Sequence, residues 1–267
     1  MDLADIREYV PGDDVRHIDW NVTARMDTPY VREYLEDREI TAQFLLDVSP
    51  SVDFGTATAL KRDRLIDFVA VLSRLLTRQG NKVGAVIYGG HVEHVVPARS
   101  GRVQVLRLID ELERRPRLER APATALAELL ETGLRSIRRR SLVFVVSDFF
   151  STPGWERPLA LLARRHEVLA IRLSDPRERE LPDIGMVVMN DSETGEHVWV
   201  DTSDRGFRTR FAAAVLRRDE TLAGIFQRSG VESLELSTED DMVRAVLRFA
   251  AKRKLRTARQ RAMAVAS

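Results

Sequence analysis

The chain has 267 residues, of which 44% are apolar, so it can build one large domain or two small ones around a substantial core. Its 42 basic and 41 acidic side chains nearly cancel, which leaves no global field that favours nucleic acid or anionic lipid. The lack of cysteine excludes disulfides and thiolate zinc sites and fits a reducing compartment. No stretch approaches the roughly 18 uninterrupted apolar residues that a membrane helix needs, so we expect a cytoplasmic protein without a transmembrane segment.

Three segments are expected from the pattern of charge and hydrophobicity. Residues 1–39 are highly charged, and we expect them to form a segment packed on the main domain. Within it, Pro11 and Gly12 favour a turn, and Asp13 or Asp14 can cap a short helix. Residues 40–254 are expected to form that domain, and residues 255–267 a basic tail.

The first half of the domain begins with an apolar run of strand length over 40–48, which is followed by a helical pattern over 60–79. Two β-branched runs joined by glycines, at 81–90 and 91–100, predict a hairpin that adds an antiparallel edge strand. The segment 141–150 is the most apolar of the chain. Its hydrophobicity does not alternate, which predicts burial on both faces in the middle of a parallel sheet.

Helical and extended patterns alternate along the rest of the domain. The helices are predicted at 103–114, 125–139, 155–165, 207–228 and 239–256, and the strands at 167–173, 186–189, 197–200 and 231–236. Strands that alternate with helices indicate an α/β fold with a doubly wound, mostly parallel, Rossmann-type sheet flanked by helices.

The loop after the first strand carries oxygen ligands at every second position. Asp47 ends the strand, and Ser49 and Ser51 follow it. An extended loop points alternate side chains the same way, so a carboxylate and two hydroxyls converge on one point. Such a set suits a hard cation such as Mg²⁺, which takes six oxygen ligands and keeps several waters.

A second carboxylate, Asp148, lies at the C-terminal end of the most apolar strand, and Thr124 precedes a predicted helix. Ligands of open α/β sheets bind outside the C-terminal strand ends where the strand order reverses. If the 141–150 strand neighbours the first strand on the side away from the hairpin, Asp47 and Asp148 face each other there. Two carboxylates this close repel each other unless a cation lies between them.

Two other interpretations use the same residues. Asp, Ser and Thr before helices are ordinary N-cap residues, so the loop can serve as a helix cap without any metal. Alternatively, the carboxylates can support a Mg²⁺-dependent phosphoester hydrolase, although no complete catalytic constellation or Walker-type loop is present in the sequence. Lys61 and Asp63, which open the first helix, are predicted on its solvated side.

The set Asp47, Ser49, Ser51, Thr124 and Asp148 resembles the metal-ion-dependent adhesion site of von Willebrand factor A domains. The resemblance implies that the hydroxyls coordinate Mg²⁺ or Mn²⁺ directly, that the aspartates bind it directly or through water, and that one position is left for an acidic residue of a partner. Thr124 departs from the pattern because its loop lacks the usual glycines.

The N-terminal segment resembles the hallmark of the bacterial family called domain of unknown function 58, over roughly residues 4–240. The hallmark residues are Tyr9, Gly12, Asp13, Asp14, Arg16, Ile18, Asp19, Trp20, Ala24 and Arg25, with the stretch VREYLEDREI at 31–40. The sequence begins almost at this hallmark and so resembles the soluble members. The family implies a non-enzymatic, metal-dependent adaptor or co-chaperone that acts with a MoxR-type AAA+ ATPase.

The hallmark also permits a physical interpretation. Arg16 and Asp19 are spaced to pair on a helical turn, and Trp20 offers a large apolar anchor, so these residues are expected to fasten the segment to the sheet. Basic runs at 138–140 and 252–254 are interpreted as solvated helix ends, with no nucleic-acid partner and at most a peripheral contact with a membrane.

Overall fold

The computed structural model describes residues 2–35, 40–56, 59–116, 123–190 and 197–247. The chain forms two compact units, residues 1–39 and 40–267. The packing of the first unit on the second stays a prediction. The predicted tail at 255–267 and the end of the predicted helix 239–256 lie outside the described residues; a helix is described over 242–247.

The N-terminal unit is a two-stranded antiparallel hairpin, which the sequence did not predict, and its connection contains two short helices. Its elements are β1 (Asp2–Glu8), η1 (Val15–His17), α1 (Trp20–Met26) and β2 (Tyr30–Leu35). Asp14 caps η1 by accepting from the backbone N–H of Arg16, as one of the two predicted caps. The neighbouring Asp13 binds the Arg7 guanidinium through two hydrogen bonds of 2.8 Å. Asp13 and Asp14 therefore stabilise the turn of the N-terminal unit itself.

The predicted pair of Arg16 with Asp19 is wrong. The Arg16 guanidinium binds Asp14 instead, with its Nη2 2.9 Å from Oδ2. Asp19 is engaged at the start of α1, where its carboxylate accepts from the backbone N–H groups of Asn21 and Val22. Trp20 is 70% exposed, so the first unit does not bury it as an anchor.

The larger unit is built on a six-stranded sheet in the order β10-β7-β6-β3-β4-β5. Its strands are β3 (Thr41–Asp47), β4 (Lys82–Tyr88), β5 (Val92–Arg99), β6 (Leu142–Ser147), β7 (Glu167–Ser174) and β10 (Glu232–Ser237). All neighbours are parallel except β4 and β5, which form the predicted antiparallel hairpin at the edge. The strand β6 lies beside β3 on the side away from this hairpin, which is the condition under which Asp47 and Asp148 were expected to face each other.

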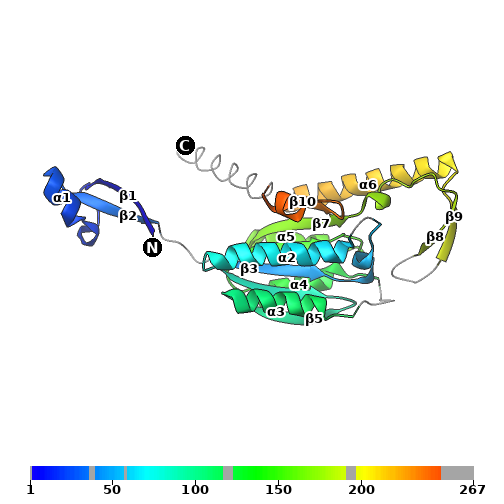
Figure 1. Cartoon of the computed structure of the whole chain (residues 1–267), viewed down its shortest axis with the longest axis horizontal. Helices are drawn as coiled ribbons and strands as arrows, with labels where there is room; N and C mark the ends of the chain where they lie inside the picture. Colours follow the sequence, from blue (N-terminus) through cyan, green and yellow to red (C-terminus); the bar gives the residue numbers. More distant parts are fainter. Residues whose placement is uncertain (1, 36–39, 57–58, 117–122, 191–196, 248–267) are drawn as a thin grey trace. The chain divides into compact units, whose positions relative to one another are not determined.

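Helices cover both faces of this sheet (Figure 1). They are α2 (Lys61–Arg78), α3 (Arg102–Glu113), α4 (Leu126–Ser136), α5 (Glu156–Arg165) and α6 (Arg205–Ser229). Along β3, Phe44 and Leu46 pack with α2 and α3 in one core, whereas Leu45 packs with α4 and α5 in the other. Every residue of β6 is buried, which confirms the prediction of a doubly covered central strand. The doubly wound α/β class is thereby confirmed.

A second, two-stranded sheet stands between β7 and the long helix α6 along the chain. It consists of β8 (Met186–Asn190) and β9 (His197–Asp201), which are antiparallel. In Figure 1 this sheet lies at the end of α6 where the helix begins. Only two residues of α6 are buried, Leu222 and Phe226, and both belong to its second half. The first half therefore has side chains available to line a surface near β8.

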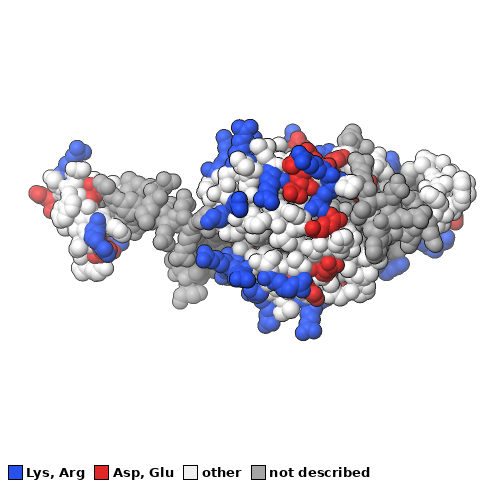
Figure 2. All heavy atoms as spheres, turned by 90° about the horizontal axis from the view of Figure 1, so that it is seen from below, with Lys and Arg blue, Asp and Glu red and all other residues white. Residues whose placement is uncertain are grey.

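No helix in the described part of the chain has the length and apolar character needed to span a membrane. Figure 2 shows acidic and basic side chains sharing one face of the molecule. The basic run at 138–140 follows α4 and is exposed, as predicted.

Candidate metal centre

The two aspartates of the predicted site come from neighbouring parallel strands. Asp47 is the last residue of β3, and Asp148 follows the last residue of β6. The strands are in register, with Leu46 opposite Val146, so both carboxylates reach the C-terminal edge of the sheet. The five predicted site residues are all buried: Asp47, Ser49, Ser51, Thr124 and Asp148.

The loop after β3 brings its polar groups together. The Asp47 Oδ1 atom accepts from the backbone N–H of Ser49 at 3.0 Å, and the Oγ atoms of Ser49 and Ser51 lie 3.2 Å apart. Ser49 precedes a 3-10 helix, η2 (Pro50–Asp53), but its side chain makes no capping bond there. The helix α2 begins only at Lys61. The interpretation of these serines as helix caps is therefore wrong.

Ser147 connects the two carboxylate loops, and the sequence did not single it out. Its hydroxyl donates to Asp47 Oδ2 at 2.6 Å and accepts from the backbone N–H of Phe149 at 2.9 Å. Phe149 has a left-handed backbone, with a φ of 58°, that non-glycine residues rarely adopt. Its ring packs against Trp155 and Phe226, with centroids 5.5 and 5.0 Å away, which holds this conformation.

Thr124 lies in a loop that is tied to the loop after β6. Its backbone carbonyl accepts from the backbone N–H of Thr152 and from the hydroxyl of Ser151, both at 2.9 Å. The N-cap position of α4 is Ala125, so Thr124 does not cap that helix. The structure thus places a third buried hydroxyl-bearing residue beside the loop that carries Asp148.

Lys61 is the main correction to the sequence-based prediction, because it is buried and not solvated. Only 1% of it is exposed, and its Nζ atom donates to Asp148 Oδ2 at 2.8 Å and to Glu178 Oε1 at 2.6 Å. Lys61 opens α2 beside the C-terminal end of β6, within hydrogen-bonding distance of Asp148 and Glu178. The available signal was electrostatic: a lysine in a first helical turn opposes the helix dipole and calls for an acidic partner.

The ionisable groups at this edge of the sheet interact strongly with one another. Burial, together with the negative charge of Asp148, raises the pKa of Asp47 to about 6, although hydrogen bonds from Ser147 and Ser49 act in the opposite direction. Burial acts to lower the pKa of Lys61, but the charges of Asp148 and Glu178 outweigh it and the pKa is raised. The three carboxylates Asp47, Asp148 and Glu178 face the Lys61 ammonium and the Arg218 guanidinium, so one negative charge remains in a largely buried region.

The donor set fits a hard divalent cation. In an octahedral Mg²⁺ complex with bonds of about 2.1 Å, adjacent oxygens lie about 3.0 Å apart. The Ser49 and Ser51 hydroxyls are hydrogen-bonded at 3.2 Å, and this separation is also close to that edge. Among the described residues no group of three or more His, Asp or Glu side chains could hold a metal, so hydroxyls and waters would complete the coordination.

The order and direction of the strands, with helices on both faces, define a von Willebrand factor A-like α/β fold. The crystal structure of the conserved hypothetical protein BatB from Bacteroides thetaiotaomicron matches 80% of this chain and 98% of its own, with a TM-score of 0.53 and 14% identity. An aerotolerance-related membrane protein from Bacteroides fragilis, solved with multiple mutations to serines, matches 76% and 92%, with a TM-score of 0.51 and 13% identity. These likenesses show the fold alone.

The sequence identifies the family. Residues 5–221 match the model of "Protein of unknown function DUF58", and the chain belongs to this family. It is 39% identical over 248 residues to the uncharacterized protein Rv1480 of Mycobacterium tuberculosis, which covers 93% of this chain and 78% of that protein. A protein of Mycobacterium avium, MAV169, is 38% identical over 159 residues, 60% of this chain and 94% of its own. The family resemblance predicted from the hallmark is confirmed.

Proposed function

We propose that this chain is a divalent-cation-dependent protein-binding module without enzymatic activity. In this proposal Asp47, Ser49, Ser51, Thr124 and Asp148 hold Mg²⁺ or Mn²⁺, and an acidic side chain of the partner completes the coordination. The bound ion supplies the positive charge that attracts this side chain. The observation that supports the proposal most is the meeting of two buried carboxylates from neighbouring strands with two hydroxyls 3.2 Å apart.

The residues around the donor set have separate tasks. Ser147 orients Asp47, and the backbone N–H of Phe150 orients Asp148 by donating to its Oδ1 atom at 3.0 Å. Lys61 holds the other oxygen of Asp148 and limits the repulsion between the carboxylates before the cation binds. The hydrogen bonds from Ser147 and Phe150 preorganise the oxygen ligands, as such bonds do around known metal sites, whereas the Lys61 ammonium competes with the cation for Asp148.

The family resemblance implies a MoxR-type AAA+ ATPase as the partner, with this chain as its adaptor or co-chaperone. The formal charge of +1 gives no global attraction to an acidic partner, so the local charge of the ion would supply it.

The metal is tested by calorimetric titration of the full chain with Mn²⁺ and with Mg²⁺. We expect Asp47→Asn to abolish binding. The matched control is Asp67→Asn, at a half-exposed carboxylate of α2, and it should bind as the wild type does. Equal affinity of the wild type and of Asp47→Asn would remove the basis of the proposal.

The partner is tested with a purified MoxR-type ATPase from the same cell, by capture in Mg²⁺ and in EDTA. Capture should require Mg²⁺ and should be lost in Asp47→Asn, whereas capture unaffected by both changes refutes the partner. The hydrolase alternative predicts a different result, namely Mg²⁺-dependent turnover of a generic phosphoester that disappears in Asp148→Ala.

A further inference from the structure

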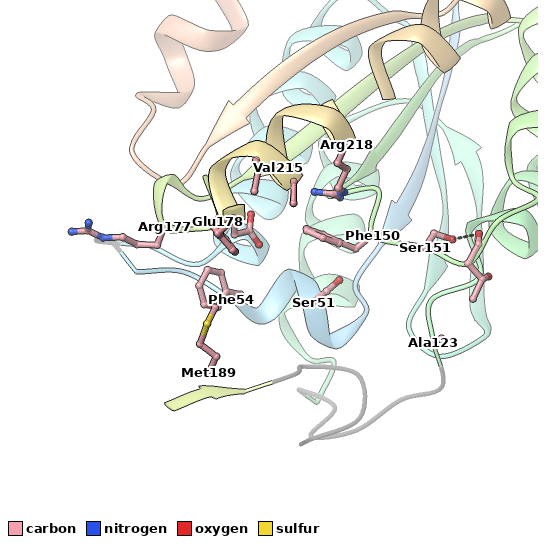
Figure 3. Close-up of a pocket in the computed structure, with 13 residues that line it drawn as sticks. Ser51, Phe54, Ala123, Phe150, Ser151, Arg177, Glu178, Met189, Val215 and Arg218 are labelled. Carbon is pink, nitrogen blue, oxygen red and sulfur yellow. Dashed lines mark hydrogen bonds between the residues drawn. The ribbon is translucent and has the colours of Figure 1, made fainter. Parts of the chain in front are cut away.

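A cavity of about 720 Å³ opens beside the candidate metal centre (Figure 3). Ser51, one of the candidate ligands, forms part of its wall. The largest apolar residues that line the cavity are Phe54, Phe150, Met189, Phe211 and Val215. Its volume lies in the range of about 300–1,000 Å³ that is typical of ligand-binding pockets.

Each carboxylate-bearing loop contributes one aromatic ring to this cavity. Phe54 lies three positions after Ser51, and Phe150 two positions after Asp148. The rings are 40% and 38% exposed, although they lie next to buried polar groups. Figure 3 shows Val215 and Arg218 of α6 pointing toward the Phe150 ring. The apolar wall and the candidate metal ligands are therefore parts of one continuous surface.

The charged groups of the cavity favour an acidic ligand. Arg218 stacks on the Phe150 ring, with its guanidinium carbon 3.2 Å from the ring centroid, and donates to the backbone carbonyl of Asp148 at 3.0 Å. Arg177 also lines the cavity, with its guanidinium pointing away from the other labelled residues (Figure 3). The acidic residue that lines the described cavity, Glu178, is bound by Lys61 at 2.6 Å. The cavity therefore presents apolar surface with a surplus of positive charge.

We infer that the cavity receives a segment of a partner protein in which a large apolar residue lies within about three positions of an acidic residue. This inference rests on the proposed function: the acidic side chain reaches the metal centre beside Ser51, and the apolar side chain enters between Phe54 and Phe150. Residues of an extended peptide are about 3.3 Å apart along the strand, so one short segment can span both parts. The partner thus binds through a mixed acidic and apolar motif, and a carboxylate alone is insufficient.

Charge also argues against the chain's own C-terminal residues as the occupant. Residues 252–261 contain six basic and no acidic side chains, so their charge has the same sign as Arg177 and Arg218. A partner segment with a carboxylate is complementary to the cavity, and like-charge contacts disfavour the tail.

The inference is tested with a displayed library of random dodecapeptides, selected against the full chain in Mg²⁺. Ala214→Trp fills the cavity from α6, where Ala214 is an exposed lining residue. The matched control is Ala212→Trp, at an exposed alanine of the same helix outside the lining. The wild type and the control should enrich peptides with Asp or Glu close to Leu, Met or Phe, and Ala214→Trp should not.

The enriched peptide is then synthesised and its affinity is measured by fluorescence anisotropy. Changing its acidic residue to the amide, or its apolar residue to Ser, should each weaken binding at least about tenfold, and Ala214→Trp should weaken it by a similar factor while keeping its affinity for Mn²⁺. If peptides with the acidic residue alone bind equally well, or if both tryptophan variants bind alike, the inference is wrong while the metal proposal stands.

Three further outcomes overturn the inference. Peptide binding that survives EDTA and Asp47→Asn shows that the cavity acts independently of the metal centre. Sedimentation that shows dimers of the wild type but monomers of Ala214→Trp assigns the cavity to a second copy of the chain. A selection that enriches no common motif shows that the cavity does not recognise a segment with neighbouring acidic and apolar residues.

Discussion

The Asp47→Asn substitution separates the cost of a buried charge from the benefit of a bound cation. Asp47 is fully buried near Asp148, and its pKa is raised from 3.8 to about 6. One pKa unit corresponds to about 1.36 kcal/mol, so ionised Asp47 costs the metal-free folded protein about 3 kcal/mol relative to the unfolded chain. Asparagine keeps the shape of the side chain without this charge.

The sign of the effect follows from proton binding. Between pH 3.8 and about 6 the folded state holds a proton on Asp47 that the unfolded chain has lost, so the contribution of this group to stability falls as the pH rises through that window. Asp47 accepts from Ser49 with one oxygen and from Ser147 with the other, whereas asparagine has a single acceptor oxygen, so one of the two hydrogen bonds is lost at a cost of about 1 kcal/mol. Metal-free Asp47→Asn should therefore be about 2 kcal/mol more stable than the wild type near neutral pH, and slightly less stable below pH 4.

Urea unfolding in EDTA, from pH 4 to pH 8, measures this difference. Mg²⁺ at about 100 times its Kd should then stabilise the wild type by about 2.7 kcal/mol and leave Asp47→Asn unchanged. Asp67→Asn, the exposed control, should follow the wild type in both conditions. If Asp47→Asn is the less stable protein in EDTA near neutral pH, the carboxylate is not strained by burial and by Asp148, and the electrostatic reasoning fails.

Three other substitutions test the surroundings of the site. Lys61→Met leaves Asp148 without its ammonium partner, so urea unfolding should show that the metal-free protein is destabilised by about 3 kcal/mol. Calorimetry should show an affinity for Mn²⁺ that is at least about tenfold higher, because a competing positive charge is lost. A lower affinity would contradict this prediction. The Asp175 carboxylate accepts four hydrogen bonds, from Thr56, Arg177 and Thr238, and so ties together the loops after η2, β7 and β10. Thermal unfolding of Asp175→Ala should show that the free energy of unfolding falls by about 2–4 kcal/mol. A fall of less than about 1 kcal/mol would count against this role. Gly84→Ala places a Cβ 2.8 Å from backbone atoms of β5 and should cost about 1–3 kcal/mol, which an unchanged unfolding midpoint would disprove.

Much of the sheet could be predicted because the hydrophobic pattern within each strand shows which of its faces are buried. The unbroken apolar run that became β6 requires cover on both faces, and β-branched runs with glycines between them require a hairpin such as β4 and β5. The alternating oxygens of Asp47, Ser49 and Ser51 are equally local, since an extended loop fixes which side chains converge. The N-terminal hairpin of β1 and β2 escaped prediction, because its charged strands lack an apolar pattern that marks a buried face.

The surroundings of Asp47 and Asp148 were decided by tertiary structure. A lysine that opens a helix is usually solvated, and only the placement of α2 over the end of β6 turned Lys61 toward Asp148, 87 positions away. The cavity likewise joins Phe54 and Phe150 to Val215, from three segments distant along the chain. Hydrophobic periodicity records which side of a segment is buried, and so the sequence by itself determined the layers and the candidate ligands. It does not record which distant segment covers that side, and so only the folded chain decided how those ligands are paired, charged and enclosed.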